Sequence, residues 1–445
     1  MKIASKKAWV VTVEMGYGHE RAAYALKDLA YGNIIAANKY PGIPKRDKEL
    51  WLKTKQIYET ISRFKSIPLL GDIIFEVMDK LQSIPAFYPR RDLSAPNLQL
   101  REVYAMIRKG TGKHLIEELI KRNKKLPLVA TFFQVAFAAE EFGYPGEIYC
   151  VICDADCSRA WVPLDPKKSR IKYFTPNGRV VERLKLYGVK PENIYLTGFP
   201  LPKELIGGPK MTVIKQDLSR RLRNLDPNQI FISKYDKTIA SYLGKNWRQL
   251  DHKHPLTLTF AVGGAGAQKG IGLQITESLA TQISRGKIKL NLLAGVRQDV
   301  ASYFKQGIKK LGLSRFLNNG VNVLFEKNHQ HYFTALSRYL HTTDILWTKP
   351  SELSFYTGLG LPIIMAPAIG SQEQFNRIWL KTVGAGITQN DPKYTKEWLF
   401  DWLGSGGLAR VAWNGFVEAP THGTYRIEGI ITGEKVELEQ LPLIV

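Results

Sequence analysis

The feature that most constrains the fold of this chain is the run ILWTKPSELSFYTGLGLPIIMAPAIGSQEQFNRIWLKTVGAG at residues 345–386. It predicts a buried strand, a tight Lys-Pro-Ser turn, a helix, a second strand at Leu361 to Met365, a polar loop and another helix. In a parallel α/β sheet such loops lie at the carboxyl ends of the strands, where ligands bind. The run therefore offers two helix N-termini and a Gln-Glu-x-x-Asn cluster to a polar, anionic ligand.

The two halves of the chain begin in the same way. Near the N-terminus, a predicted strand at Trp9 to Val13 leads into the turn Gly16 to His19 and then into a helix. In the second half, a predicted strand at Leu256 to Val262 leads into the turn Gly263 to Gly266 and another helix. Strands and helices alternate after each opening, which is typical of a parallel sheet with helices on both faces. The sequence thus predicts an α/β protein with two Rossmann-like domains that face each other across a cleft.

The length also favours two domains, because 445 residues exceed one ordinary hydrophobic core. Residues 51 to 119 are predicted to be mostly helical and rich in aromatic side chains, within the first domain. The predicted divisions are a first domain at 1–206, a basic interdomain connection with added helices at 207–255, a second domain at 256–404 and a short β-rich tail at 405–445.

Neither a membrane-spanning helix nor a signal peptide is expected. Apolar runs stay well short of the ~20 residues that cross a bilayer, and the first apolar run is typical of a strand. The three cysteines, Cys150, Cys153 and Cys157, lack a fourth ligand for a structural zinc ion. We expect buried free thiols, which suit a reducing cytoplasm.

The charge balance is unusual, since 63 Lys and Arg residues face 40 Asp and Glu residues and leave a net charge of +23. Such a charge favours anionic partners: nucleic acid, an anionic membrane face or a phosphorylated substrate. A basic surface without a specific role is an open alternative. The sequence contains no zinc finger, RNA-binding module or basic-region heptad, so no nucleic-acid partner is expected.

Five motifs together carry a resemblance to a known family. They are GYGHERAAYAL, VICDADCSRAW, YFTPNGRVVERLKLYGVKPENIYLTGFPL, the turn AVGGAGAQ and the run at residues 345–386. Over roughly residues 8 to 404, the chain resembles the GT-B glycosyltransferases of the group that contains monogalactosyldiacylglycerol synthase, processive diacylglycerol glucosyltransferase and the peptidoglycan-precursor N-acetylglucosaminyltransferase. The resemblance implies an inverting transferase that moves a sugar from a UDP-sugar to a lipid or membrane-borne acceptor. It implies no metal and no cofactor other than the nucleotide-sugar co-substrate.

The donor site is predicted in the second half. A diphosphate leaving group gathers negative charge, which backbone N–H groups at a glycine turn and nearby cations can stabilise. A tight strand-to-helix connection is the alternative role for the same turn. The predicted donor-binding residues are Gly263, Gly264, Gly266, Gln268, Arg297, Phe325, Lys349, Pro350, Ser351, Glu352, Gln372, Glu373 and Asn376.

One departure from the family pattern concerns the nucleotide. The resemblance implies a ribose-binding glutamate five residues before the Gly of Gly-Leu-Pro, where this chain has Phe355. Glu352 lies one helical turn earlier and is the candidate replacement. Downstream, Gln372, Glu373 and Asn376 match the loop that contacts sugar hydroxyls in relatives, although a capped helix start would use the same residues.

The acceptor site and the catalytic base are predicted in the first half. Gly16 and Gly18 allow close backbone approach, and His19 opens the following helix, whose N-terminus is expected to lower the imidazole pKa. Asp154 follows a strand, and Trp161 comes seven residues later, which matches the spacing in the glycolipid enzymes. Inverting transfer needs a base for the acceptor hydroxyl proton. Asp154 is the first candidate and His19 is its partner or alternative, while a helix cap remains the structural alternative for Asp154.

Three functions remain open on the sequence. The leading one is a hexosyltransferase peripheral to the cytoplasmic face of a membrane, with its helical basic segment against anionic lipid. The others are a nucleotide-sugar epimerase of the same fold and a non-catalytic nucleotide-sugar-binding protein.

Overall fold

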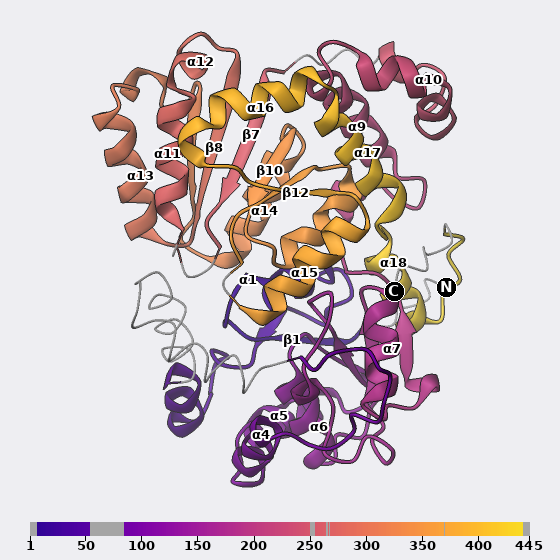
Figure 1. Ribbon diagram of the computed structural model, residues 1–445. Helices are drawn as coiled ribbons and strands as arrows, with labels where there is room; N and C mark the ends of the chain where they lie inside the picture. Colours follow the sequence, from indigo (N-terminus) through magenta and orange to yellow (C-terminus); the bar gives the residue numbers. More distant parts are fainter. Residues whose placement is uncertain are drawn as a thin grey trace, which may run out of the picture. The chain divides into compact units, whose positions relative to one another are not determined.

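The structure is a computed structural model that describes residues 7–53, 84–249, 254–263, 266, 268–368 and 370–438. The chain divides into two compact units, which Figure 1 colours along the sequence. The first unit comprises Met1–Pro202, Ile369–Asn376 and His422–Val445, and the second comprises Lys203–Ala368 and Arg377–Thr421.

The first unit is built on a six-stranded sheet in the order β2-β1-β3-β4-β5-β6, with every pair parallel. Its strands are β1 (Trp9–Thr12), β2 (Ile35–Ala36), β3 (Leu128–Ala130), β4 (Ile148–Val151), β5 (Lys172–Thr175) and β6 (Ile194–Leu196). β1, β3 and β4 are buried along their whole length, as strands covered on both faces are. The strand order reverses between β1 and β3, where the Thr131 hydroxyl donates to the Thr12 hydroxyl oxygen at 2.9 Å.

The first unit also contains helices. They are α1 (Tyr17–Ala25), α4 (Leu98–Arg108), α5 (Lys113–Asn123), α6 (Phe133–Glu141), α7 (Gly178–Leu186), α18 (Gly423–Thr432) and the first half of α15 (Ser371–Thr382). In α4, the Asn97 side chain accepts a hydrogen bond from the Leu100 N–H and caps the helix. Both α4 and α5 pack against α6. The helices predicted between residues 51 and 119 are confirmed for α4 and for the start of α5, while residues 54–83 lie outside the described part of the chain.

The second unit is built on a six-stranded sheet in the order β12-β11-β10-β7-β8-β9, again parallel throughout. Its strands are β7 (Leu256–Ala261), β8 (Ile288–Gly295), β9 (Val321–Phe325), β10 (Ile345–Thr348), β11 (Ile363–Met365) and β12 (Gly386–Thr388). Here the strand order reverses between β7 and β10, which pair with Trp347 opposite Phe260. Two sheets of this type confirm the predicted α/β class and the two Rossmann-like domains of a GT-B fold. The cleft between the domains stays a prediction.

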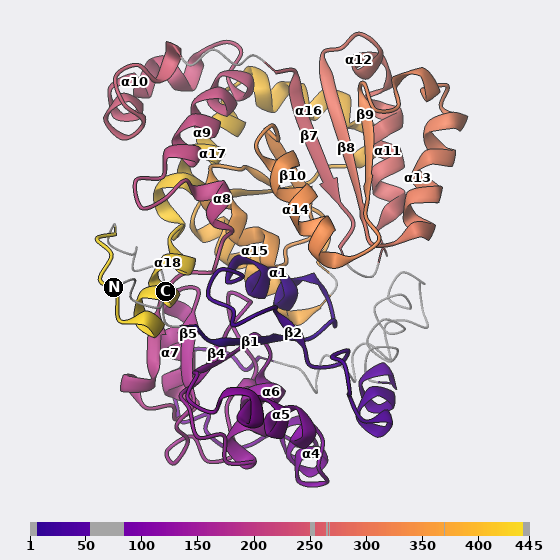
Figure 2. The ribbon, with the colours of Figure 1, turned by 180° about the vertical axis from the view of Figure 1, so that it is seen from behind.

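The helices of the second unit are α8 (Lys203–Ile206), α9 (Thr212–Leu225), α10 (Ile230–Leu243), α11 (Lys269–Ser278), α12 (Ala280–Ser284), α13 (Gln298–Lys310), α14 (His329–Leu340), α16 (Thr395–Gly404), α17 (Gly407–Glu418) and the second half of α15. Figure 2 shows α11 beside α13 at one flank of the unit and α9 beside α17 at the other. The helix predicted after Ser351 is the 3-10 helix η5 (Glu352–Leu359).

The segment at 207–255 is not the interdomain connection that its polar, basic sequence predicted. It contains α9 and α10, which pack against each other and against α17 as part of the second unit. Arg221 of α9 is buried, and its guanidinium donates to the carbonyl oxygens of Leu340, Thr343, Leu359 and Gly360. An arginine that binds four carbonyl groups belongs to the interior, which the local composition did not reveal.

The prediction of a β-rich tail at 405–445 is also wrong. Residues 407–418 and 423–432 form the helices α17 and α18. In α17 the buried side chains Leu408, Val411, Ala412 and Phe416 follow helical spacing. The β-branched and aromatic residues of this segment favour strands locally, but packing of one helical face overrides that preference. Across the residues that the structure describes, no helix has the length and apolarity to span a membrane.

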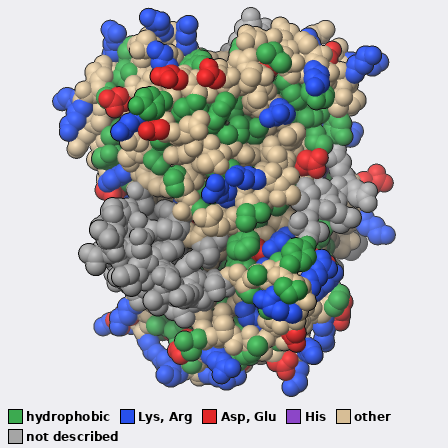
Figure 3. Space-filling view, viewed as in Figure 1, with side chains coloured by type: hydrophobic (Ala, Val, Ile, Leu, Met, Phe, Trp, Pro, Cys, Tyr) green, Lys and Arg blue, Asp and Glu red, His purple; other side chains and the backbone are tan. Residues whose placement is uncertain are grey.

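The basic residues do not gather into one patch on the face that Figure 3 shows. Lys and Arg side chains occur there at many separate places, with Asp and Glu among them. The positive charge on the described part of this face is therefore spread rather than clustered.

Candidate functional site

Residues predicted for the donor site follow different strands of the second sheet. Gly263 comes after β7, Arg297 after β8, Phe325 ends β9 and Lys349 comes after β10. Because all six strands are parallel, these positions share one edge of the sheet. Gly263 and Lys349 flank the point where the strand order reverses, which is where open α/β sheets bind ligands.

The glycine turn has a geometry that requires glycine. Gly263 and Gly266 have positive φ angles of 72° and 68°, and the Gly266 N–H donates to the Gly263 carbonyl oxygen at 3.3 Å. A Cβ atom on Gly263 would lie 2.9 Å from Cε of Lys349, and one on Gly266 would lie 3.3 Å from Nε of Arg297. The absence of side chains lets two cations lie against the turn. Gly264, also predicted here, falls outside the described residues.

Arg297 has a fixed orientation at this edge. Its Nε and Nη2 donate to the two carboxylate oxygens of Asp299 at 3.2 and 3.1 Å. Partial burial opposes the charge of Asp299, but the hydrogen bonds from Arg297 hold the pKa of its carboxyl group below the usual value. The side chain of Arg297 keeps 21% of its surface exposed, so the guanidinium remains accessible.

Gln268 connects the glycine turn to a neighbouring loop. Its Nε2 donates to the Pro367 carbonyl oxygen at 2.8 Å, and Pro367 follows β11. The next residue, Lys269, places its ammonium group 4.8 Å from the ring centre of Tyr303. Gln268 therefore stabilises the turn, and its direct contact with a ligand stays a prediction.

The turn after β10 is largely enclosed. Pro350 is buried, Ser351 is half-buried, and the side chain of Ser351 makes no capping bond to η5. Phe355, at the position of the family glutamate, packs on Trp379 with ring centres 4.8 Å apart. Glu352 is only 8% exposed, and its role as a replacement for that glutamate stays a prediction.

The structure brings together two residues that the sequence assigned to different binding sites. Asn376, predicted to contact the donor, lies in the half of α15 that belongs to the first unit. Its Nδ2 donates to Oδ1 of Asp154, the predicted base, at 2.9 Å. In the same helix Glu373 is 9% exposed and Gln372 is half-buried.

The loop that carries Asp154 is also fixed by residues that the sequence did not single out. Asn177 Nδ2 donates to the Ala155 carbonyl oxygen at 3.1 Å, and Asn177 Oδ1 caps α7. Asp156 is fully buried and accepts two hydrogen bonds from Arg183, each 2.9 Å long, and one from Arg179. The pattern Asn-Gly-Arg-Val-Val-Glu-Arg identifies a capped helix in the sequence, but it does not show that both arginines bind Asp156.

His19 lies at the reversal point of the first sheet, in a surrounding of aromatic rings. Its ring centre is 4.9 Å from that of Phe132 and 5.9 Å from that of Trp161. Burial lowers the pKa of His19 to about 4, against the opposing effect of the Thr131 backbone. The sequence predicted this direction but attributed it to the helix N-terminus. With its pKa lowered by burial, the imidazole is neutral near pH 7, and among the described residues its Nδ1 has no hydrogen-bond partner.

The remaining residues predicted for the acceptor site surround this histidine. Gly16 is the residue before α1 and has a φ angle of 123°, while Gly18 is within the helix. Trp161 is 7% exposed, and its carbonyl oxygen accepts a hydrogen bond from the Tyr173 hydroxyl.

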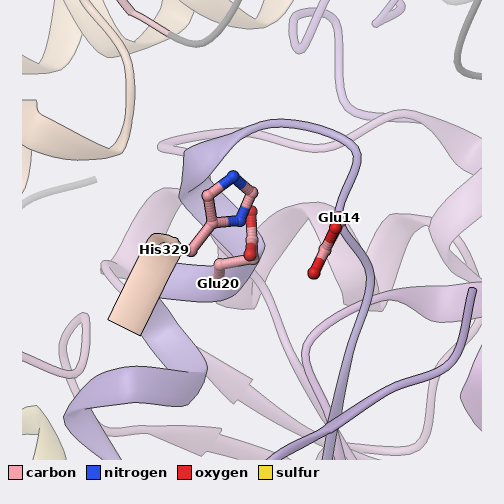
Figure 4. Close-up of side chains that lie close together, drawn as sticks. All are labelled: Glu14, Glu20 and His329. Atoms are coloured by element: carbon pink, nitrogen blue, oxygen red, sulfur yellow. The ribbon is translucent and has the colours of Figure 1, made fainter. Parts of the chain in front are cut away.

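Two carboxylates flank the same turn. Figure 4 shows Glu14, which follows β1, and Glu20 of α1, and their nearest oxygens lie within 4.8 Å of each other. Glu14 also pairs with Lys39 at 3.4 Å. His329, drawn in the same figure, opens α14 of the second unit.

Comparison with known proteins shows only distant likeness. A family described as a domain of unknown function, DUF6938, matches residues 237–403, which include the second sheet. A processive diacylglycerol beta-glucosyltransferase from Bacillus licheniformis is 20% identical over 402 residues, which cover 87% of this chain and 84% of that protein. This is a weak homology within the glycosyltransferase group.

Solved structures with a related fold are equally distant. MurG from Acinetobacter baumannii is 13% identical with a TM-score of 0.41, and the match covers 96% of this chain and all of that one. A UDP-GlcNAc 2-epimerase from Neisseria meningitidis, solved with UDP-GlcNAc, is 10% identical with a TM-score of 0.43, and the match covers 77% of this chain and 84% of that one. WaaG, a glycosyltransferase involved in lipopolysaccharide biosynthesis, is 13% identical with a TM-score of 0.37, and the match covers 75% of this chain and 96% of that one.

Proposed function

We propose that the protein is an inverting glycosyltransferase that moves a hexose from a nucleoside diphosphate, most simply UDP, to a hydroxyl group of a lipid or membrane-borne acceptor. The observation that carries the proposal is the pair of cations, Lys349 and Arg297, placed against the glycine turn at the reversal point of the second sheet.

The second unit provides what a diphosphate needs. As the bond between the anomeric carbon and the diphosphate oxygen breaks, negative charge grows on that oxygen. Backbone N–H groups at the start of α11 and two nearby cations stabilise this charge without a metal ion. Arg297 donates from Nε and Nη2 to Asp299, and its remaining N–H groups on Nη1 and Nη2 are suited to a phosphate.

The first unit provides the base. The carboxylate of Asp154 takes the proton of the acceptor hydroxyl, whose oxygen then attacks the anomeric carbon from the face opposite the diphosphate. His19 is neutral and serves as a hydrogen-bond partner for the acceptor. One base and one displacement invert the anomeric configuration.

The acceptor class is inferred from a relative. The relative from Bacillus licheniformis is named for diacylglycerol, and the chain aligns with most of its length. We extend this to the present protein as a proposal, together with a peripheral position at an anionic membrane.

Two measurements test the proposal in order. Calorimetric titration with UDP, UDP-glucose, UDP-galactose and UDP-GlcNAc should give micromolar binding for at least one. Transfer from that donor should then occur to diacylglycerol in phosphatidylcholine vesicles, and more rapidly when phosphatidylglycerol is added. Epimerised sugar formed without an acceptor would replace the transferase with an epimerase. Tight binding with no turnover over a broad acceptor panel would leave a binding protein.

A further inference from the structure

The amide of Asn376 is hydrogen-bonded at both ends, within the first unit. The Ala155 N–H donates to its Oδ1 at 2.8 Å, and its Nδ2 donates to Asp154 Oδ1 at 2.9 Å. Because the amide oxygen faces a donor, the nitrogen must face the carboxylate, and the orientation of the amide is unambiguous. The side chain has no exposed surface.

The carbonyl group of Ala155 is also hydrogen-bonded. The Ala155 carbonyl oxygen accepts a hydrogen bond from Asn177 Nδ2 at 3.1 Å. Ala155, the residue after the predicted base, thus donates its N–H to Asn376 and accepts a hydrogen bond from Asn177. Asp156, two residues after the base, is fixed by Arg183 and Arg179. Of these groups, only Asn376 bonds the carboxylate of Asp154 itself.

We propose that Asn376 is a positioning residue that orients the Asp154 carboxylate for proton abstraction, and that it does not contact the donor sugar. The inference rests on the proposed function, in which Asp154 is the base. A carboxylate on a loop rotates freely about its last torsion angle unless a fixed donor holds it. Reaction rates fall steeply when a reacting group leaves its productive geometry, so a fixed donor increases the rate of the chemical step.

The location of Asn376 favours this role over contact with the sugar. A residue that recognises sugar hydroxyls needs an amide group accessible to ligand, and this amide is enclosed with both ends bonded. Gln372, one turn earlier in α15, is half-buried and is the better candidate for such contact.

The first experiment replaces the amide of Asn376 by a carboxylate. N376D keeps the size of the side chain and an acceptor for the Ala155 N–H, but it places a second carboxylate against Asp154. We expect kcat to fall about 10- to 100-fold while KM for the donor and Kd for UDP stay within about twofold. The matched control is N414D, because Asn414 donates to the Gly384 carbonyl at 3.2 Å in the second unit. Full kcat in N376D, or a raised donor KM with unchanged kcat, would overturn the proposal.

The second experiment does not depend on activity. Thermal unfolding midpoints are compared for D154N, N376D and the double variant D154N/N376D. The double variant again has an amide facing a carboxylate, but the amide is now at position 154 and the carboxylate at position 376. We expect N376D to lower the midpoint by about 2 °C or more and the double variant to recover most of that loss. Strictly additive shifts would mean that the two side chains are not coupled. If the wild-type protein transfers no sugar at all, the proposed function fails, but this cycle still decides whether Asn376 holds Asp154.

Discussion

The two sheets have the same parallel topology, yet the edges at which their strands end differ in charge. At the reversal point of the second sheet, Lys349 and Arg297 lie against an open glycine turn. At the reversal point of the first sheet, a neutral His19 lies among aromatic rings. Nearby, the carboxylate of Asp154 is held by an amide group.

This difference shows that the sheet determines where a ligand binds, while the residues after each strand determine which ligand. The second edge can attract a diphosphate because its cations and its backbone N–H groups share one place. The first edge can hold a base because the neutral amide of Asn376 fixes the carboxylate of Asp154. Each prediction below tests one side of this contrast.

The largest effect is expected from removal of the base. D154N should lower transfer by about 10²- to 10⁴-fold, because the amide cannot take the acceptor proton. The affinity for UDP, measured by calorimetry, should stay within about twofold, since the donor edge belongs to the other unit. Substantial transfer activity in D154N would contradict the assignment and move the role of base to His19.

The next effect concerns the cationic edge. R297A and K349A should each weaken UDP binding by about 10- to 100-fold, because each removes a charge-assisted contact to phosphate. The loss should shrink at high salt, which calorimetry at low and high NaCl can measure. R285A and K287A are matched controls, since both residues are exposed and precede β8 at the amino edge of the sheet. If R285A and K287A lose as much UDP affinity, the binding would come from the general positive charge and not from a specific site.

A smaller effect is expected at His19, on the pH dependence of the stability of the fold. The pKa of His19 is about 4 in the folded protein and near 6.5 when unfolded. Between these values the unfolded chain binds a proton that the folded chain does not, so stability should fall as the pH drops from about 6.5 to 4, by roughly 1–3 kcal/mol. H19Q should lose this dependence, whereas H331Q, on the surface of α14, should keep it. Unfolding in urea at several pH values would measure it, and identical pH curves for H19Q and wild type would contradict the assignment.

The smallest effect concerns the choice of sugar. Q372A and E373A should change the ratio of kcat/KM for UDP-glucose and UDP-galactose by about 2- to 10-fold, and affinity for UDP itself should change little. Competition assays with both donors would measure the ratio. An unchanged ratio in both variants would remove α15 from sugar recognition.

The sequence by itself determined the fold class, and it predicted the edge at which we propose that the donor binds. In the run at 345–386, strand and helix periodicity predicted β10, β11 and α15, and the structure confirms all three. Such patterns are local, since each strand or helix is encoded by residues a few positions apart. The glycine turn after β7 was found for the same reason.

Only the tertiary structure shows which side chains that are far apart in the sequence contact each other. Asn376 and Asp154 are 222 residues apart, and no local pattern predicts that one binds the other. The buried Arg221, the helical end of the chain and the role of burial in the pKa of His19 were likewise missed. Burial and hydrogen bonding depend on the folded surroundings of a side chain, whereas composition reports only its neighbours in sequence.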